Sequence, residues 1–170
     1  MQTDREVTFK LIWNQMQNSK FKEFYVNLLL EKFKRMERAI NIFLIIVTST
    51  SISAWAIWEM EYLKWLWAAL IATSQIILLI KPYLNYAKCT KELSEKYFLL
   101  QTLNVEYEKL WLNYKFERIT DEQAFDKAFD LKTTLTKGLN FSEDIIIKEN
   151  KKIFNKAKEK LSKYLKTYFN

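Results

Sequence analysis

This chain contains two long uncharged segments that are separated by a short acidic turn. Residues 39–58 include no charged side chain, and neither do residues 65–80. A helix of twenty residues is about 30 Å long, which matches the hydrocarbon core of a bilayer. We therefore predict two transmembrane helices, at residues 39–58 and 63–81, joined by an external turn at residues 59–62.

The alternative is a buried helical hairpin in the core of a soluble protein. Two patterns favour the membrane. Tryptophans gather on both sides of the turn, as they do at a membrane interface; they are Trp55, Trp58, Trp65 and Trp67. Lysines and arginines flank the outer ends of both segments, whereas the turn has only Glu59 and Glu61. By the positive-inside rule, both termini are expected in the cytoplasm of a bacterium, with the hairpin in its inner membrane.

Turn-forming residues are extremely scarce, with one Gly and one Pro in 170 residues. Sheets and long loops depend on such residues, so we predict an all-α fold. The expected organisation is a single domain. A cytoplasmic N-terminal helix at residues 1–38 leads into the hairpin, and cytoplasmic helices at residues 82–170 form a bundle.

The reactive side chains also limit the possible functions. The chain has no His and a single Cys, Cys89. This excludes His-based triads, His general bases and His-ligated metal sites. We expect no enzymatic activity, no metal and no cofactor.

Polar side chains occur in both predicted spans, and four of them are candidates for packing between helices or for lining a pore. Asn41, Thr48 and Ser51 fall on one helical face of the first span, and Gln75 lies in the second. Small and polar residues commonly mediate packing between membrane helices. Alternatively, these four could line a water-filled pore, which would need several copies because two helices cannot enclose a channel.

After Pro82, a long helix is predicted from Tyr86 to Glu117. Its apolar residues recur at heptad spacing and define a seam; they are Leu93, Leu100, Leu103, Tyr107, Leu110 and Tyr114. The seam could pack against the N-terminal helix of the same chain or against another subunit. Both kinds of contact could also occur together. Because a pore would need several copies, we expect a homo-oligomer.

Local signals mark three further boundaries. A break is expected in the first helix at residues 14–19, where Asn and Ser compete with the helix. A capping box opens a helix at Thr120, and Gly138 is expected to end it in a left-handed conformation. Ser142 is expected to cap the last helix.

The last helix has a basic surface, formed by Lys148, Lys151, Lys152, Lys156, Lys160 and Lys163. It could be a solvated face of a packed helix, or it could contact anionic lipid headgroups or nucleic acid. Arg is absent from this helix, so direct recognition of nucleic acid is the least favoured alternative.

The order of a cytoplasmic helix, two spans with a short acidic turn and further cytoplasmic helices resembles the SLATT family. These are small two-transmembrane effectors of bacterial anti-phage systems of the nucleotide-signalling or retron type. The resemblance implies an effector that oligomerises, permeabilises the inner membrane and causes growth arrest or cell death. It also implies a sensor or regulatory protein from the same operon as a partner. The alternative function is a non-enzymatic membrane scaffold that binds a partner through its cytoplasmic helices.

Overall fold

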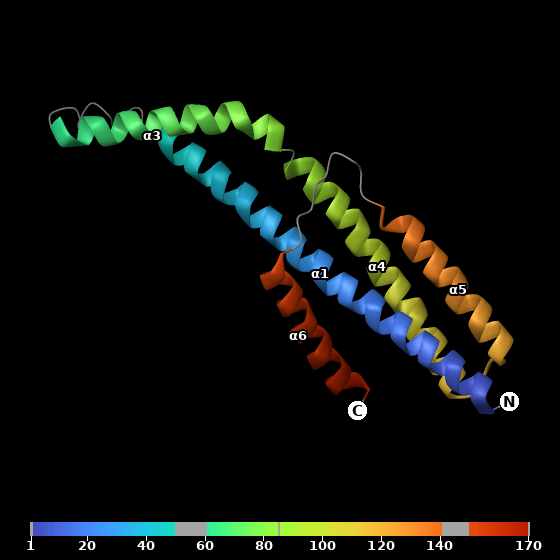
Figure 1. The fold of residues 1–170 in the computed structure, drawn as a ribbon. Helices are drawn as coiled ribbons and strands as arrows, with labels where there is room; N and C mark the ends of the chain where they lie inside the picture. Colours follow the sequence, from blue (N-terminus) through green and yellow to red (C-terminus); the bar gives the residue numbers. More distant parts are fainter. Residues whose placement is uncertain (1, 50–60, 85, 141–149, 170) are drawn as a thin grey trace. The chain divides into compact units, whose positions relative to one another are not determined.

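The computed structural model describes residues 2–49, 61–84, 86–140 and 150–169. Within these ranges the protein is all-α, as predicted, and no strand occurs. The helices, labelled in Figure 1, are α1 (Gln2–Ser49), α3 (Glu61–Ile80), the 3-10 helix η1 (Lys81–Leu84), α4 (Tyr86–Lys115), α5 (Asp121–Gly138) and α6 (Lys151–Tyr168).

The chain divides into two compact units. The first, here called the bundle unit, consists of Met1–Leu30 and Lys91–Asn170. The second, here called the apolar unit, consists of Glu31–Thr90. The helices α1 and α4 each contribute to both units, and each unit is described separately below.

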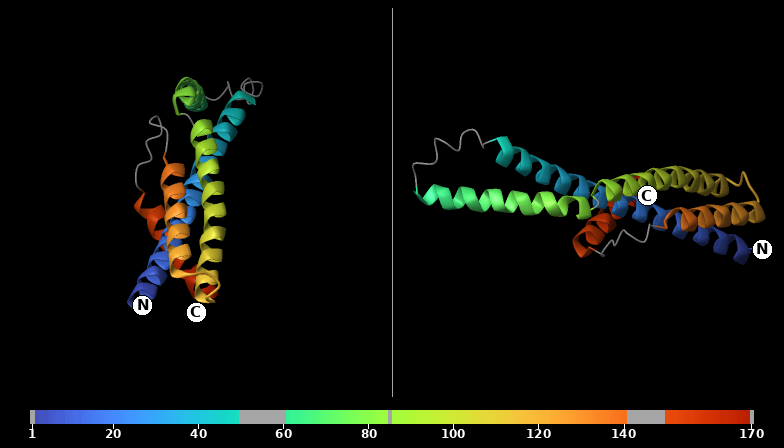
Figure 2. Two further views of the ribbon diagram at one scale, coloured as in Figure 1. Left: turned by 90° about the vertical axis from the view of Figure 1, so that its right-hand side faces the viewer. Right: turned by 90° about the horizontal axis from the view of Figure 1, so that it is seen from above.

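In the bundle unit, α1 and α4 run side by side in opposite directions (Figures 1 and 2). The Tyr107 hydroxyl donates to Gln15 Oε1 at 3.4 Å, and the Tyr114 hydroxyl donates to the Arg5 carbonyl at 3.1 Å. Apolar side chains fill the space between these contacts, including the fully buried Ile12. This packing creates the long-range core around which the other two helices are arranged.

The predicted break at residues 14–19 is wrong, because α1 is continuous from Gln2 to Ser49. Met16 and Ser19 are almost completely buried in the bundle unit. Burial against neighbouring helices therefore outweighs the low helix propensity of Asn and Ser, which is worth only a few tenths of a kcal/mol per residue.

A left-handed residue ends α4. The φ angle of Glu117 is 56°. Its amide donates to the Tyr114 carbonyl at 3.1 Å, and the Arg118 amide donates to the Asn113 carbonyl at 2.9 Å. These two bonds form a Schellman motif, which satisfies carbonyls that the helix end leaves open.

The helix α5 begins as predicted and ends differently. Thr120 accepts from the Gln123 amide at 3.3 Å, and Gln123 Oε1 accepts from the Thr120 amide at 3.1 Å, so the capping box is confirmed. Gly138, however, has no positive φ and lies in the helix. A Cβ at this position would overlap the Leu99 side chain, so the absence of a side chain at Gly138 allows α5 to lie close to α4.

The helix α6 begins later than the sequence indicated. Asn150 has an extended backbone and caps the helix, accepting from the amides of Lys152 and Ile153 at 3.1 Å each. Asn150 therefore caps α6, in place of the predicted Ser142. Ser142 itself lies outside the described residues.

The apolar unit contains the two predicted spans. Among the described residues, one helix, Lys64–Tyr83, is long and apolar enough to cross a membrane. It consists mostly of α3 and continues into η1, where Pro82 lies between α3 and α4. Residues 50–58 of the first predicted span, and residues 59–60 of the turn, lie outside the described residues. The two-span hairpin is therefore not established by the structure.

Candidate functional site

The most distinctive surface of the apolar unit is the exposed apolar side of α3. Only 6% of the membrane-length segment is buried. Trp65 is 82% exposed and Leu79 is 71% exposed, although both are large and apolar. The core helix of a soluble protein would have such side chains covered. Contiguous exposed apolar surface of this kind is typical of a membrane or protein contact.

The end of α1 in the same unit has a similar surface. Ile42, Ile45 and Ile46 are more than half exposed, whereas Leu44 and Val47 are buried. The first predicted span is thus helical as far as Ser49, and its side chains are partly uncovered as far as Val47. In the parts of the two predicted spans that the structure describes, large apolar side chains are therefore exposed.

The four polar residues predicted in the spans have different environments. Gln75 is exposed on α3, and Asn41 is half-buried on α1. The side chain of Thr48 and the whole of Ser51 lie outside the described residues. Two other hydroxyls on α3 are bonded within their own helix. Thr73 Oγ1 donates to the Ala69 carbonyl at 2.7 Å, and Ser74 Oγ donates to the Ile71 carbonyl at 2.8 Å. Of the two predicted residues whose side chains are described, Gln75 is therefore the more exposed.

Of the four tryptophans predicted at the membrane interface, two are described. Trp65 is exposed and Trp67 is half-buried, both near the beginning of α3. Trp55 and Trp58 lie outside the described residues. Their place in an aromatic belt stays a prediction.

All six residues predicted to form a seam on α4 are buried inside the bundle unit, with exposed fractions of 5% or less; they are Leu93, Leu100, Leu103, Tyr107, Leu110 and Tyr114. Their covering comes from the same chain. Burial raises the pKa of Tyr107 to about 12, and burial together with a bond to Asp121 raises the pKa of Tyr114 to about 12. The seam therefore builds the intrachain bundle, and contact with another subunit would need a different surface.

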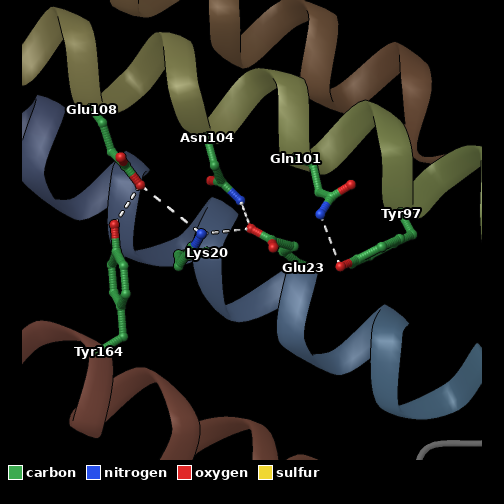
Figure 3. Close-up of polar contacts among 7 residues, drawn as sticks. All are labelled: Lys20, Glu23, Tyr97, Gln101, Asn104, Glu108 and Tyr164. Atoms are coloured by element: carbon green, nitrogen blue, oxygen red, sulfur yellow. Dashed lines mark hydrogen bonds and ion pairs between the residues drawn. The ribbon is translucent and has the colours of Figure 1, made fainter. Parts of the chain in front are cut away.

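A partly buried polar network, which the sequence pattern did not predict, crosses the bundle unit (Figure 3). The Lys20 ammonium lies 2.9 Å from Glu23 and 3.9 Å from Glu108. Asn104 Nδ2 donates to Glu23 Oε2 at 2.5 Å, and the Tyr164 hydroxyl donates to Glu108. Burial and the bond to Glu108 raise the pKa of Tyr164. The network thus joins side chains of α1, α4 and α6.

The network combines the Lys20 ammonium with the carboxylates of Glu23 and Glu108. The neutral side chains of Asn104 and Tyr164 donate hydrogen bonds to these carboxylates. The Lys20 side chain is 16% exposed and that of Glu23 is 9% exposed. The Lys20 ammonium also lies 4.8 Å from the centre of the Tyr164 ring, where the face of the ring attracts a cation. A signal for this network existed in the sequence, since Lys20 and Glu23 fall among the apolar positions of α1. The contacts join side chains of three helices, so the arrangement positions these helices in the bundle unit.

Aromatic rings attach α6 to the other helices of the bundle unit. Phe169 packs edge-on against Trp13 and Trp111, with ring centres 5.3 Å and 5.0 Å apart. Phe154 packs edge-on against Phe21 at 5.1 Å. The apolar face of α6 is therefore directed at α1 and α4.

The opposite face of α6 is basic and exposed. Of the lysines predicted there, the described ones are all exposed: Lys151, Lys152, Lys156, Lys160 and Lys163. Lys148 lies outside the described residues. The apolar face of α6 is thus used inside the bundle, and its cationic face is available to solvent or to an anionic partner.

No group of His, Cys, Asp or Glu that could hold a metal ion is present among the described residues. Cys89 is buried in the apolar unit. Comparison with known proteins found no matching family model, no similar curated protein and no similar solved structure.

Proposed function

We propose that this chain is an integral membrane protein of a bacterial inner membrane, anchored by a hairpin of α1 and α3. The observation on which the proposal rests is the membrane-length helix Lys64–Tyr83, of which only 6% is buried. Burial of apolar area is worth about 25 cal/mol per Å². A lipid environment would supply that stabilisation along the whole segment, and the isoleucines of α1 would face the same environment.

We further propose that the protein acts by assembling into oligomers that permeabilise the membrane, as an effector of antiviral defence. The exposed Gln75 supports this step. An amide surrounded by hydrocarbon costs several kcal/mol unless it finds a hydrogen-bond partner. Gln75 side chains from several copies could donate hydrogen bonds to one another, or they could face a shared water-filled pore. The setting in defence follows from the family resemblance.

A membrane scaffold is the second candidate. It is favoured by the size of the bundle unit and by the exposed basic face of α6, which offer surface for a partner. The two candidates differ in their dependence on Gln75. A scaffold needs only an apolar span, and an assembling effector needs the polar contact.

The test is induced expression in a bacterium that contains a membrane-potential dye. The wild type is compared with Gln75→Leu and with Thr73→Val at equal membrane levels. Thr73→Val is the matched control, because the Thr73 hydroxyl is bonded within its own helix and is not needed between copies. We expect the wild type and Thr73→Val to depolarise the cells and Gln75→Leu to fail.

Other outcomes would change the proposal. Equal depolarisation by all three proteins would remove Gln75 from the assembly and retain permeabilisation. Absence of depolarisation in all three, with the protein intact in the membrane, would favour the scaffold.

A further inference from the structure

A groove in the apolar unit lies where the uncharged part of the chain ends. It has a volume of about 460 Å³, within the range of roughly 300–1,000 Å³ that is typical of small-ligand sites. Its lining comes from α1 on one side and from the end of α3, η1 and the start of α4 on the other. Both uncharged segments reach their charged boundary here, at Arg38 and Lys81.

The lining of the groove is amphipathic. Ile40 and Leu78 provide an apolar floor on the side of the uncharged segments. Lys81, Lys88 and Glu37 provide charged groups beyond it. Two lysines and one glutamate give the lining a net charge of +1. Lys81 is exposed, so its ammonium can meet a ligand without first being uncovered.

From this arrangement we infer a binding site for one acidic phospholipid. Its phosphate would contact Lys81, its glycerol hydroxyls would contact Glu37 or Tyr86, and an acyl chain would lie along Leu78 and Ile40. A single phosphodiester carries one negative charge, which balances the net charge of the groove. Basic pockets between membrane helices on the cytoplasmic side favour anionic headgroups for the same reason.

The inference rests on the membrane placement proposed above and adds the class of ligand. A free anion such as inorganic phosphate would use Lys81 but would leave the apolar floor uncovered. A zwitterionic lipid would use the floor but would bring its own cation close to the two lysines. An acidic phospholipid uses both parts of the groove.

The experiment measures lipid binding to the full chain. The protein is purified in a non-ionic detergent and titrated with phosphatidylglycerol or with phosphatidylcholine of the same acyl chains, and native mass spectrometry counts the bound lipids. We expect one phosphatidylglycerol to be retained more strongly than phosphatidylcholine. Inorganic phosphate added in excess should not displace it.

Three variants locate the site. Lys81→Gln should weaken phosphatidylglycerol binding about fivefold, because one lysine near an anionic headgroup is worth about 1 kcal/mol. Ala87→Trp fills the groove without changing its charge, and it should weaken binding of both lipids at this site. Lys64→Gln removes an exposed lysine at the other end of α3 and should leave binding unchanged. Lys156→Gln, on the basic face of α6, should likewise have no effect.

Two results would overturn the site. One is equal binding of phosphatidylglycerol by the wild type, Lys81→Gln and Ala87→Trp. The other is a loss of phosphatidylglycerol binding in Lys64→Gln or Lys156→Gln that equals the loss in Lys81→Gln. Such a result would indicate that the anionic lipid is attracted to any exposed lysine. Carbonate extraction of the expressing cells shows whether a negative result concerns the lipid site alone or also the proposed membrane placement. Release of the protein by carbonate would overturn the membrane placement together with the site, whereas retention without selective binding would overturn the site alone.

Discussion

Among the described residues, Glu117 is the one non-glycine residue with a positive φ, and it closes the Schellman motif after α4. The left-handed conformation costs an L-residue about 1–2 kcal/mol. Its carboxylate accepts from Arg5 at 2.7 Å, and this bond raises the pKa of Arg5. Both side chains are exposed, so water screens the ion pair and its contribution to stability is small.

Replacement of Glu117 separates these two effects. Glu117→Gly and Glu117→Ala both remove the ion pair, but only glycine adopts the positive φ without strain. We expect Glu117→Gly to be more stable than Glu117→Ala by about 1 kcal/mol. Urea unfolding of the two variants, followed by circular dichroism, measures the difference. Equal midpoints would contradict the left-handed assignment at this residue.

Lys20 is the one cation of the polar network in Figure 3, and its removal leaves two carboxylates close together. Breaking a fully buried pair costs about 3–5 kcal/mol, and the partial exposure of Glu108 lowers that figure here. We expect Lys20→Met to destabilise the protein by about 2 kcal/mol. Thermal unfolding in detergent gives the measurement.

A second variant tests whether charge causes the loss. Lys20→Met combined with Glu23→Gln removes one of the two carboxylates, so part of the lost stability should return. If the double variant is as unstable as Lys20→Met, the loss comes from packing of the lysine stem and the electrostatic explanation fails.

At the scale of elements, α3 is a helix whose apolar side chains point outward without cover. Ile76 is 56% exposed and lies seven residues before the end of the membrane-length segment Lys64–Tyr83. A lysine at the centre of a membrane helix costs about 2.5–3.5 kcal/mol on insertion, whereas a lysine on a water-exposed helix costs almost nothing. The same substitution therefore has opposite consequences in the two environments.

We expect Ile76→Lys to reduce the fraction of protein that carbonate extraction leaves in the membrane. Tyr83→Lys, at an exposed position in η1, is the control and should extract like the wild type. If Ile76→Lys remains fully membrane-bound, α3 does not cross the hydrocarbon core.

At the scale of the whole molecule, the proposal requires both chain ends on the same side of the membrane. Cys89 is buried, so it is replaced by Ala to give a background without thiols. In intact cells an impermeant thiol reagent should label Met60→Cys, which lies in the acidic turn outside the described residues. Lys163→Cys, at an exposed position of α6, should be labelled only after the inner membrane is opened. Labelling of both in intact cells would contradict the cytoplasmic assignment of the bundle.

Much of the local structure follows from residues close together in the sequence. The scarcity of Gly and Pro indicated an all-α chain, and the Thr120 capping box has its predicted bonds. The long helix after Pro82 was predicted at Tyr86–Glu117 and is observed at Tyr86–Lys115. These features depend on interactions within a few residues, so sequence spacing is enough to predict them.

Tertiary contacts decided the rest. Residues 14–19 stay helical because Met16 and Ser19 are buried. Gly138 is the last residue of α5, and a Cβ at this position would overlap the Leu99 side chain of α4. The network of Lys20, Glu23, Asn104, Glu108 and Tyr164 joins residues up to 144 positions apart in the chain. The local pattern places Lys20 and Glu23 among apolar positions, but it does not specify their partners on the other helices. Helical content and the uncharged segments depend on composition and short-range spacing, so both can be predicted from the amino-acid sequence. Which polar residues are buried together depends on which helices pack side by side, and the fold is needed to see it.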